Sequence, residues 1–478
     1  MILNFTIKDD RFDISSANIS SALEQAKLEV ENLDETIDSV KKLKPECDKL
    51  DYVLAACSGA LCGLIDIFLV GKPEKSEKPG KSEKSILGEI TDKWFEDRTK
   101  DFAKLCGWNG EGEASALRFL ENKFKVPYDQ RGCGDAGSSV FDLKPLNHHF
   151  KSLGHNPTIC GLFFSILDQF QNTSHFVSGG QLISLENAAS DFKLRGNDIA
   201  GKFFCGFVNW FGHLMSDVSG SSGSIEKGNR GMGIPSPFWA WTNDIIAIKN
   251  SLGIKVSKFD ETVNELAISI YNQGFDARFQ AAQAIPVFIN EMIVRIVYAV
   301  RRLIKYFAIT QKEERSFGLM WRTCEPFSNA TVKRMLTVAH GTFCVLDIGD
   351  ATVRSVIAGH GTFAPTEFFL RFNLVGIGRF SISLYGEGKR IFGLWRAEKK
   401  ADFARREKAI IDDYIEGLRI LADKYDDRML MTFVDDLQKS DMYISAFNKT
   451  VKLAELREVP EERILRSKSD IDKYFQRR

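Results

Sequence analysis

A histidine and an aspartate spaced four residues apart are the strongest chemical feature of the sequence. His213 and Asp217 end an apolar segment that predicts a helix, and this spacing places both side chains on one helical face. Three more histidines, at positions 148, 149 and 155, fall within eight residues of one another. Imidazole nitrogens and a carboxylate suit Zn²⁺, Mn²⁺ or Fe²⁺. We therefore name four candidate ligands of a divalent metal, Zn²⁺ or Mn²⁺, the last of them also a candidate catalytic residue: His149, His155, His213 and Asp217.

A metal at this place would support hydrolysis. A Ser- and Gly-rich loop over 219–236 follows Asp217 and can leave a coordination position open to water or phosphate. Metals of this kind lower the pKa of a bound water to about 7, which makes hydroxide available. The alternative is that His213 and Asp217 only form an i,i+4 hydrogen bond and that the other histidines are hydrogen-bonded core residues. The metal interpretation requires the two histidine blocks to meet in space.

These motifs resemble a known family. The chain resembles the membrane-bound metal-dependent hydrolases of the LexA-regulated inner-membrane type in three successive features. These are the double histidine, the apolar helix after it, and Gly212-His213-x-x-x-Asp217 followed by a Gly-rich, Pro-containing turn. The resemblance covers about 90 of the 478 residues. It implies that His149 and His155 match the family's first block, and His213 with Asp217 its second, in one metal site. The chain departs from the family by a first block one residue longer, by lacking the arginine after its first histidine, and by lacking obvious spanning helices around the blocks.

The elements that must position these residues are predicted to be helices. Apolar residues recur at helical spacing and strand patterns are few, so we expect an all-α, multi-helix protein. Four parts are expected: an N-terminal helical hairpin (1–71), a flexible Lys/Glu/Ser/Pro linker (72–86), a Phe-rich helical body (87–394) and a charged helical tail (395–478). Within the body, helices are expected over 237–252, 256–281 and 286–310.

The composition narrows the class of protein. The 64 basic and 64 acidic side chains cancel, which argues against a general nucleic-acid binder. Nine cysteines without a CxxC pair argue against a disulfide scaffold or structural zinc site and favour a cytoplasmic protein. The N-terminus lacks the pattern of a secretory signal. The 37 phenylalanines indicate a closely packed or lipid-facing helical body.

Membrane association is a second expectation. No stretch of 18 apolar residues is free of charge, and Tyr52–Gly71, with Asp66 as its only charge, comes nearest to a spanning helix. The apolar segment 284–309 carries four basic residues, which suits a helix on anionic lipid at the inner face of the membrane. Pairing with the acidic residues of the tail is the alternative. The candidate membrane or partner contacts are Arg295, Arg301, Arg302 and Lys305.

Several carboxylates lie in apolar stretches, where they must be paired or neutralised. Internal ion pairs are expected, for instance Asp350 with Arg354 and Asp66 with Arg295. Three functional classes therefore stay open: a membrane-associated metal-dependent hydrolase of a phosphoester or lipid, a non-catalytic membrane-binding protein, and a helical scaffold that binds a protein partner through its charged tail.

Overall fold

The computed structural model describes residues 40, 43–73, 85–125, 143–144, 146–187, 192, 194–226, 231–425, 432, 435 and 443–476. The first helix of the expected N-terminal hairpin and most of the expected linker lie outside these residues. In the described part the fold is mainly all-α, with one two-stranded sheet. The chain forms two units, which are described separately: residues 1–46, 329–331 and 385–478, and residues 47–328 with 332–384.

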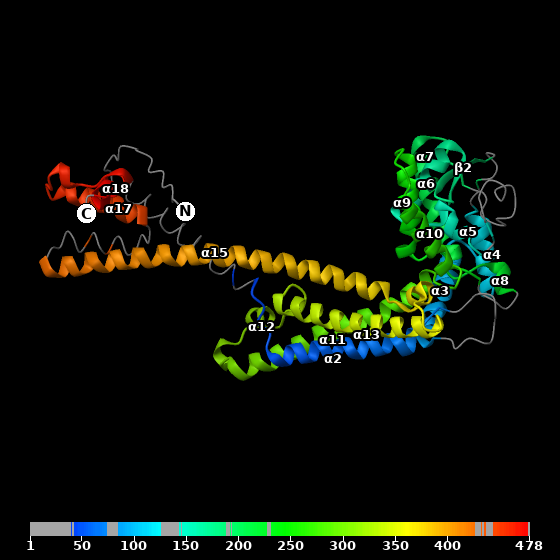
Figure 1. The fold of residues 1–478 in the computed structure, drawn as a ribbon, viewed down its shortest axis with the longest axis horizontal. Coiled ribbons are helices and arrows are strands. Elements are labelled where there is room, and N and C mark those ends of the chain that lie inside the picture. The colour runs from blue at the N-terminus through cyan, green and yellow to red at the C-terminus, as the bar shows by residue number, and fades with distance from the viewer. Residues whose placement is uncertain are drawn as a thin grey trace. The chain divides into compact units, whose positions relative to one another are not determined.

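The larger unit contains a lobe, here called the site lobe, that runs from α3 to α10 (Figure 1). Its elements are α3 (Ile86–Leu105), α4 (Glu113–Lys123), α5 (His148–Lys151), the 3₁₀ helix η3 (Leu153–His155), α6 (Ile159–Gln171), β1 (Thr173–Ser178), β2 (Gln181–Glu186), α7 (Ile199–Asp217), α8 (Ser222–Ile225), α9 (Pro237–Ser251) and α10 (Lys258–Tyr271).

Close helix packing organises this lobe. The helix α6 begins at the N-cap Thr158, whose side chain accepts from Gly161 N, and α7 begins at Asp198, which accepts from Gly201 N. The two helices pack along each other. They approach closely at Gly206, where an added Cβ would lie 2.8 Å from Ile166 Cα. The absence of a side chain at this glycine therefore sets the distance between the helix that follows the first histidine block and the helix that carries the second.

The hairpin β1–β2 was not expected from the sequence. The strands pair antiparallel from Thr173↔Glu186 to Ser178↔Gln181. Gly179 and Gly180 connect them with φ of 56° and 72°, the positive values that a two-residue turn of this kind requires. The strand β1 is buried along its whole length, so its residues do not show the alternation that marks a half-exposed strand.

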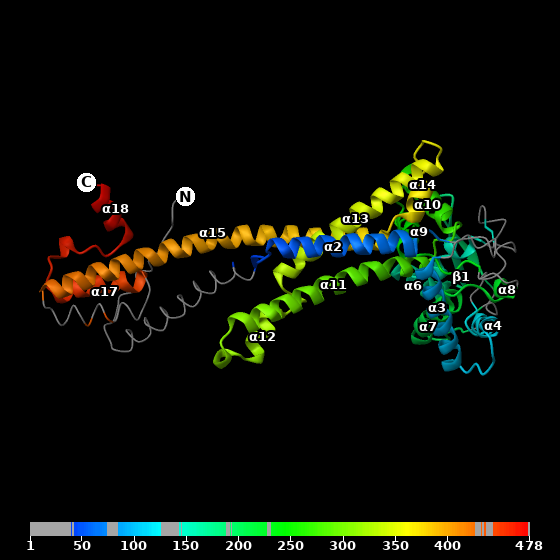
Figure 2. The same cartoon turned by 90° about the horizontal axis from the view of Figure 1, so that it is seen from below.

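The same unit contains a helical bundle, here defined as α2 (Lys49–Ile65), the π-helix η1 (Asp66–Val70), α11 (Ala277–Ile309), residues 332–358 of α13 (Ala330–Ala358) and residues 374–384 of α15 (Leu374–Tyr425). The helix α2 lies alongside α11 and α13 (Figures 1 and 2). The 3₁₀ helix η5 (Lys312–Glu314) and α12 (Phe317–Cys324) follow α11, and α14 (Pro365–Arg371) precedes α15.

The smaller unit contains the rest of α15, α17 (Tyr443–Leu456), the 3₁₀ helix η6 (Glu461–Arg463) and α18 (Lys468–Gln476). Arg390 forms an ion pair with Glu387 at 2.6 Å and donates to Leu43 O. Because α15 continues without a break from 374 to 425, the boundary expected between body and tail at 394–395 falls inside one helix.

The helix expected over 256–281 is two helices. Gly274, with φ of 103°, follows α10, and Asp276 then caps α11 by accepting from the backbone N–H groups of Arg278 and Phe279. The separation is a capping effect that apolar periodicity does not report. The expected helix over 237–252 is confirmed as α9.

One of the two expected ion pairs is present in the structure and the other is not. Arg354 Nε lies 2.8 Å from Asp350 Oδ1, so this pair is confirmed. The pairing of Asp66 with Arg295 is wrong, because Asp66 accepts from Asn373 Nδ2 at 2.6 Å. Arg295 instead donates to Pro326 O at 2.6 Å and lies 3.5 Å from Glu291.

Glycine also sets the distance between α2 and α13. A Cβ at Gly59 would overlap the carbonyl oxygen of Ala339, so we expect Gly59→Ala to force the two helices apart. The expected loss is about 1–3 kcal/mol of unfolding free energy, measured from the midpoint of thermal or denaturant unfolding. Gly349→Ala on α13 is the matched control, because a Cβ there meets no atom within 4 Å. Equal midpoints for the two variants would contradict the close-packing argument.

Candidate metal centre

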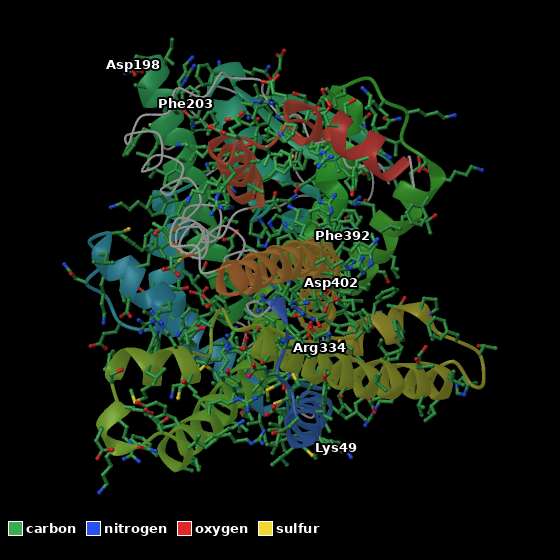
Figure 3. All side chains as sticks on the ribbon, turned by 90° about the vertical axis from the view of Figure 1, so that its left-hand side faces the viewer. Lys49, Asp198, Phe203, Arg334, Phe392 and Asp402 are labelled. Atoms are coloured by element: carbon green, nitrogen blue, oxygen red, sulfur yellow. The ribbon has the colours of Figure 1, made fainter. Side chains whose placement is uncertain are left out.

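The second histidine block lies at the end of α7. This helix begins at Asp198 and carries Phe203 on its first turns, both labelled in Figure 3. At its last turn the i,i+4 spacing places His213 Nε2 3.1 Å from Asp217 Oδ2. Both residues are buried, with 0% and 3% of their surface exposed. The helix therefore presents an imidazole and a carboxylate together, in an interior where the carboxylate requires a positive partner or hydrogen-bond donors.

The first histidine block reaches the same carboxylate oxygen. His149 Nε2 lies 3.2 Å from Asp217 Oδ2, and His155 Nε2 lies 3.9 Å from it. No single helix joins the histidines, because α5 ends at Lys151 and Ser152 is extended before η3 begins. The chain instead turns between the two histidines. The turn, and not helical spacing, brings both rings to Asp217.

The fifth member of the cluster is His148, which the candidate ligand set omitted. Its ring centroid lies 3.9 Å from that of His149 and 5.7 Å from that of His155. Two overlapping groups in the described residues have donor atoms within 4.8 Å of one another: His148, His149 and His155, and His155, His213 and Asp217. His148 is half-buried whereas the other four are buried, so it lies on the more accessible side of the cluster.

His155, His213 and Asp217 form a group that could hold a divalent metal, and His149 faces the same carboxylate oxygen. For ligands about 2.0–2.1 Å from a metal, tetrahedral geometry separates neighbouring donor atoms by about 3.3–3.4 Å. The distances of 3.1, 3.2 and 3.9 Å from Asp217 Oδ2 to the nitrogens of His213, His149 and His155 bracket this value. Three imidazoles and one carboxylate are borderline-soft donors that suit Zn²⁺ and Mn²⁺. The two histidine blocks thus meet in space, which is the condition that the metal interpretation required.

Outer contacts hold two of the candidate ligands in place. Ser216 Oγ lies 2.9 Å from Asp217 Oδ1, and His149 Nδ1 faces Gly233 O at 3.5 Å. Tyr271 donates its hydroxyl to the same Gly233 oxygen at 2.6 Å. Burial, followed by the negative charges of Asp276 and Asp217, raises the pKa of Tyr271 well above its usual value, so the phenol stays neutral and can donate. Such partners fix the orientation of metal ligands.

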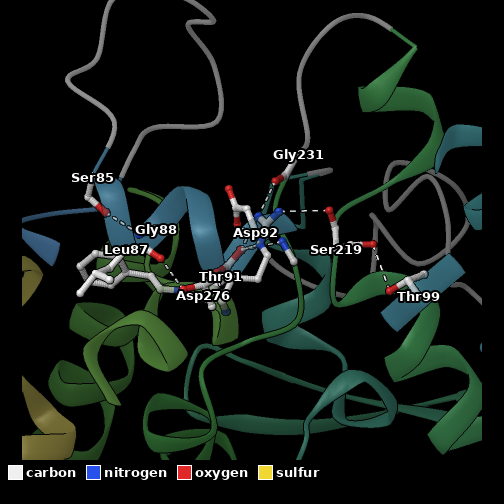
Figure 4. Close-up of polar contacts among 12 residues, drawn as sticks. Ser85, Leu87, Gly88, Thr91, Asp92, Thr99, Ser219, Gly231 and Asp276 are labelled. Carbon is white, nitrogen blue, oxygen red and sulfur yellow. Dashed lines mark hydrogen bonds and ion pairs between the residues drawn. The ribbon is translucent and has the colours of Figure 1, made fainter. Parts of the chain in front are cut away.

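An ion pair at the start of α11 joins the backbone segments on both sides of the cluster. Arg278 pairs with Asp276 and donates to Ser219 O and Gly231 O, each at 3.1 Å (Figure 4). Asp276 in turn accepts from Gly233 N at 3.1 Å. The ion pair therefore links Ser219, two positions after Asp217, to residues 231–233, whose Gly233 oxygen faces His149. A cavity of about 80 Å³ beside it is lined by Lys72, Pro73, Ser85, Gly88, Glu89, Asp92, Gly274, Asp276, Arg278 and Phe279.

Sequence reasoning missed these supporting residues. Ser216 and Tyr271 are ordinary residues of apolar helices, and no local pattern relates them to the histidines. The spacing Asp276-x-Arg278 was available, but its role depends on backbone oxygens more than 40 positions away in the chain.

Other polar residues lie outside the cluster. Asp168 Oδ1 lies 2.6 Å from His175 Nδ1 on β1, and burial raises the pKa of this carboxyl against the lowering effect of the histidine. Among the candidate lipid contacts, Arg301 and Arg302 form ion pairs with Asp51 at the start of α2. Lys305 is exposed.

No family model, characterised protein or solved structure matches this chain. The geometry of the histidine and aspartate side chains is therefore the evidence for chemistry at this cluster. The resemblance to the LexA-regulated inner-membrane hydrolases stays a prediction.

Metal content tests the centre directly. We expect purified protein supplied with Zn²⁺ or Mn²⁺ to retain about one ion per chain by elemental analysis, and His213→Ala and His149→Ala to retain little, because each loses a donor that faces Asp217. His175→Ala is the matched control, since this buried histidine pairs with Asp168 away from the cluster. Circular dichroism would establish that the variants fold. Metal-free wild type, or equal loss in the control, would contradict the assignment.

Proposed function

We propose that the protein is a metal-dependent hydrolase of a phosphoester or lipid. The observation that carries this proposal is the convergence of His149, His155 and His213 on a single oxygen of Asp217. Two segments separated by more than 50 residues supply these side chains, so the cluster is not a by-product of one helix. The resemblance of both blocks to the LexA-regulated hydrolases points to the same class of reaction.

The residues of the cluster have separate roles in this proposal. The three imidazoles and Asp217 would hold a divalent ion, and the outer contacts to Gly233 O and Ser216 fix the orientation of His149 and Asp217. When bound, such an ion supplies Lewis acidity and lowers the pKa of water to near neutrality. Burial of the donors excludes bulk water from their charges. The half-buried His148 marks the side from which substrate reaches the cluster.

Hydrolysis is tested with the purified protein loaded with Mn²⁺ or Zn²⁺ and offered phosphomonoesters, phosphodiesters and phospholipids. We expect Asp217→Asn to lower kcat at least 100-fold, because an amide binds a divalent cation more weakly than a carboxylate and does not neutralise it. Asp168→Asn is the control for loss of another buried carboxylate. Stoichiometric metal together with no hydrolysis of any substrate class would leave a structural metal site and contradict the enzyme proposal.

We also propose that the protein associates with a membrane. Two helices of the described residues, Lys49–Val70 and α11, are long and apolar enough to cross a bilayer. Both contain charged residues, so they do not meet the charge-free criterion applied to the sequence. In the most apolar 18-residue stretch of each helix, only 39% and 33% of the stretch is buried. The core helix of a soluble protein would be mostly buried. Along α11 a stripe at four-residue spacing is exposed: Phe288, Met292, Ile296, Val300 and Ile304.

The residues that α11 turns inward are more polar than this outer stripe. Gln283 and Asn290 are fully buried, and Asn290 Oδ1 accepts from Ser58 Oγ at 2.7 Å. An apolar exterior around polar contacts is the arrangement that a lipid environment favours. This polarity supports contact of the bundle with acyl chains more strongly than contact of the basic residues with headgroups, because Arg301 and Arg302 are engaged with Asp51.

Vesicle flotation tests membrane association. We expect the protein to be recovered with the membrane fraction and to float with phosphatidylcholine vesicles even after a high-salt wash, since apolar burial is insensitive to ionic screening. Ile296→Glu combined with Ile304→Glu should abolish flotation. Leu105→Glu is the control, because Leu105 is 86% exposed at the end of α3 in the site lobe. Recovery of wild type in the soluble fraction alone would exclude the proposal.

A further inference from the structure

A second cluster of ionisable groups lies inside the helical bundle, and the proposed hydrolase does not use it. Asp66 at the start of η1 and Asp347 on α13 are 3% and 2% exposed. Both are bound to Asn373, which precedes α15: its Nδ2 donates to Asp66 Oδ1 at 2.6 Å and its backbone N–H to Asp347 Oδ2 at 2.9 Å. Three segments of the bundle therefore meet at two buried carboxyl groups.

Because the single residue Asn373 donates to both of them, the two carboxyl groups lie close together, and the electrostatics of each includes a side-chain hydrogen bond to the other. Two ionised carboxylates repel at this distance, and burial in an apolar surrounding increases the cost of each charge. A hydrogen bond between two carboxyl groups requires that one of them carries a proton. The contact therefore indicates one shared proton.

Among the described residues, the groups that act on the pair do not supply a compensating positive charge. The other carboxyl that acts on the pair is Asp350, whose own partner is Arg354. The thiol of Cys344 on α13 also faces the pair, and it is neutral when protonated. From α11 the side chain near the pair is Gln283, an uncharged amide. The described contacts thus leave one negative charge of the pair to be neutralised by something other than a side chain.

The buried amide of Gln283 is an independent indication. Asn373 Nδ2 donates to Gln283 O at 2.9 Å, and Gln283 Nε2 donates to Phe372 O at 3.0 Å, so this amide packs against the same backbone that binds the carboxyls. Its Oε1 is buried and has no hydrogen-bond partner among the described residues. A buried acceptor without a donor, on the residue whose backbone oxygen accepts from Asn373, supports the presence of a further hydrogen-bond donor, such as a proton, at this place.

We propose that Asp66 and Asp347 share one exchangeable proton and form a proton-binding site in the interior of the bundle. The proton forms an O–H bond with one carboxyl and a hydrogen bond with the other, and its release leaves two carboxylates held by Asn373. The π-helical turn that begins at Asp66 supports a functional role, since such turns are frequent at functional sites. Ionisable residues inside apolar-surfaced helices commonly serve proton or ion movement.

Infrared spectroscopy of the full-length protein at neutral pH tests this site. Wild-type protein should show the C=O stretching band of a protonated carboxylic acid, and the band should shift in D₂O and on labelling with ¹³C-aspartate. We expect Asp66→Asn and Asp347→Asn each to remove or displace it, because an amide in either place donates to the remaining carboxylate and replaces the shared proton. Asp350→Asn is the matched control, one turn away and paired with Arg354, and should leave the band unchanged.

Three results would overturn the proposal. The first is a ¹³C-aspartate spectrum of wild type with ionised carboxylates alone, which needs no variant and so holds even if both variants misfold. The second is a band unaffected by either substitution. The third is a band that disappears when sodium replaces choline in the buffer, which would assign the site to a metal cation. Loss of the band in both variants, with no effect of sodium, supports the shared proton.

Discussion

A single buried oxygen, Oδ2 of Asp217, is the point on which the site lobe depends. A carboxylate that is 3% exposed is tolerated only where donors or a cation compensate its charge. Helix α7 presents it beside His213, and the turn between α5 and η3 adds two more imidazoles. The close approach of α6 and α7 at Gly206 and the ion pair of Arg278 with Asp276 hold the supporting segments. The packing of the lobe can thus be understood as support for one charge.

The bundle also buries carboxyl groups, but it surrounds them with different partners. Its buried carboxyls, Asp66 and Asp347, accept hydrogen bonds from Asn373, whereas Asp217 faces imidazoles. Outside, the helices expose large apolar side chains such as Phe288 and Ile304. The two parts of the unit therefore bury their carboxyl groups with different partners.

The sequence predicted the local parts of this structure and not the long-range ones. The all-α class, helix α9 and the pair His213–Asp217 follow from periodicity within one helix, and they are observed. The approach of His149 and His155 was a condition that spacing could not establish, since it depends on a turn at Ser152. The position of Asp66 in an apolar stretch predicts a charged partner such as Arg295. Its partner is the amide of Asn373, more than 300 positions away.

Some failures have a recognisable local cause. The hairpin has a sequence signature, Gly179-Gly180 between β-branched and aromatic residues, which predicts a two-residue turn between strands. The division of α10 from α11 also had one, Gly274 followed by the cap Asp276. In contrast, the role of Arg278 depends on the carbonyl groups of Ser219 and Gly231, and no sequence pattern encodes backbone oxygens.

The π-helical turn Asp66–Val70 makes the path of the following chain sensitive to the deletion of one residue. Gly71 N bonds to Asp66 O, five residues back, so the turn holds one residue more than an α-helix would. One residue corresponds to a rotation of about 100° around the helix axis. Deletion of a single residue in this turn would restore a regular helix and swing Lys72 and Pro73 to another side, while Lys49–Ile65 kept its contacts. The direction in which the chain leaves the bundle therefore depends on how many residues the turn contains, more than on which amino acids they are.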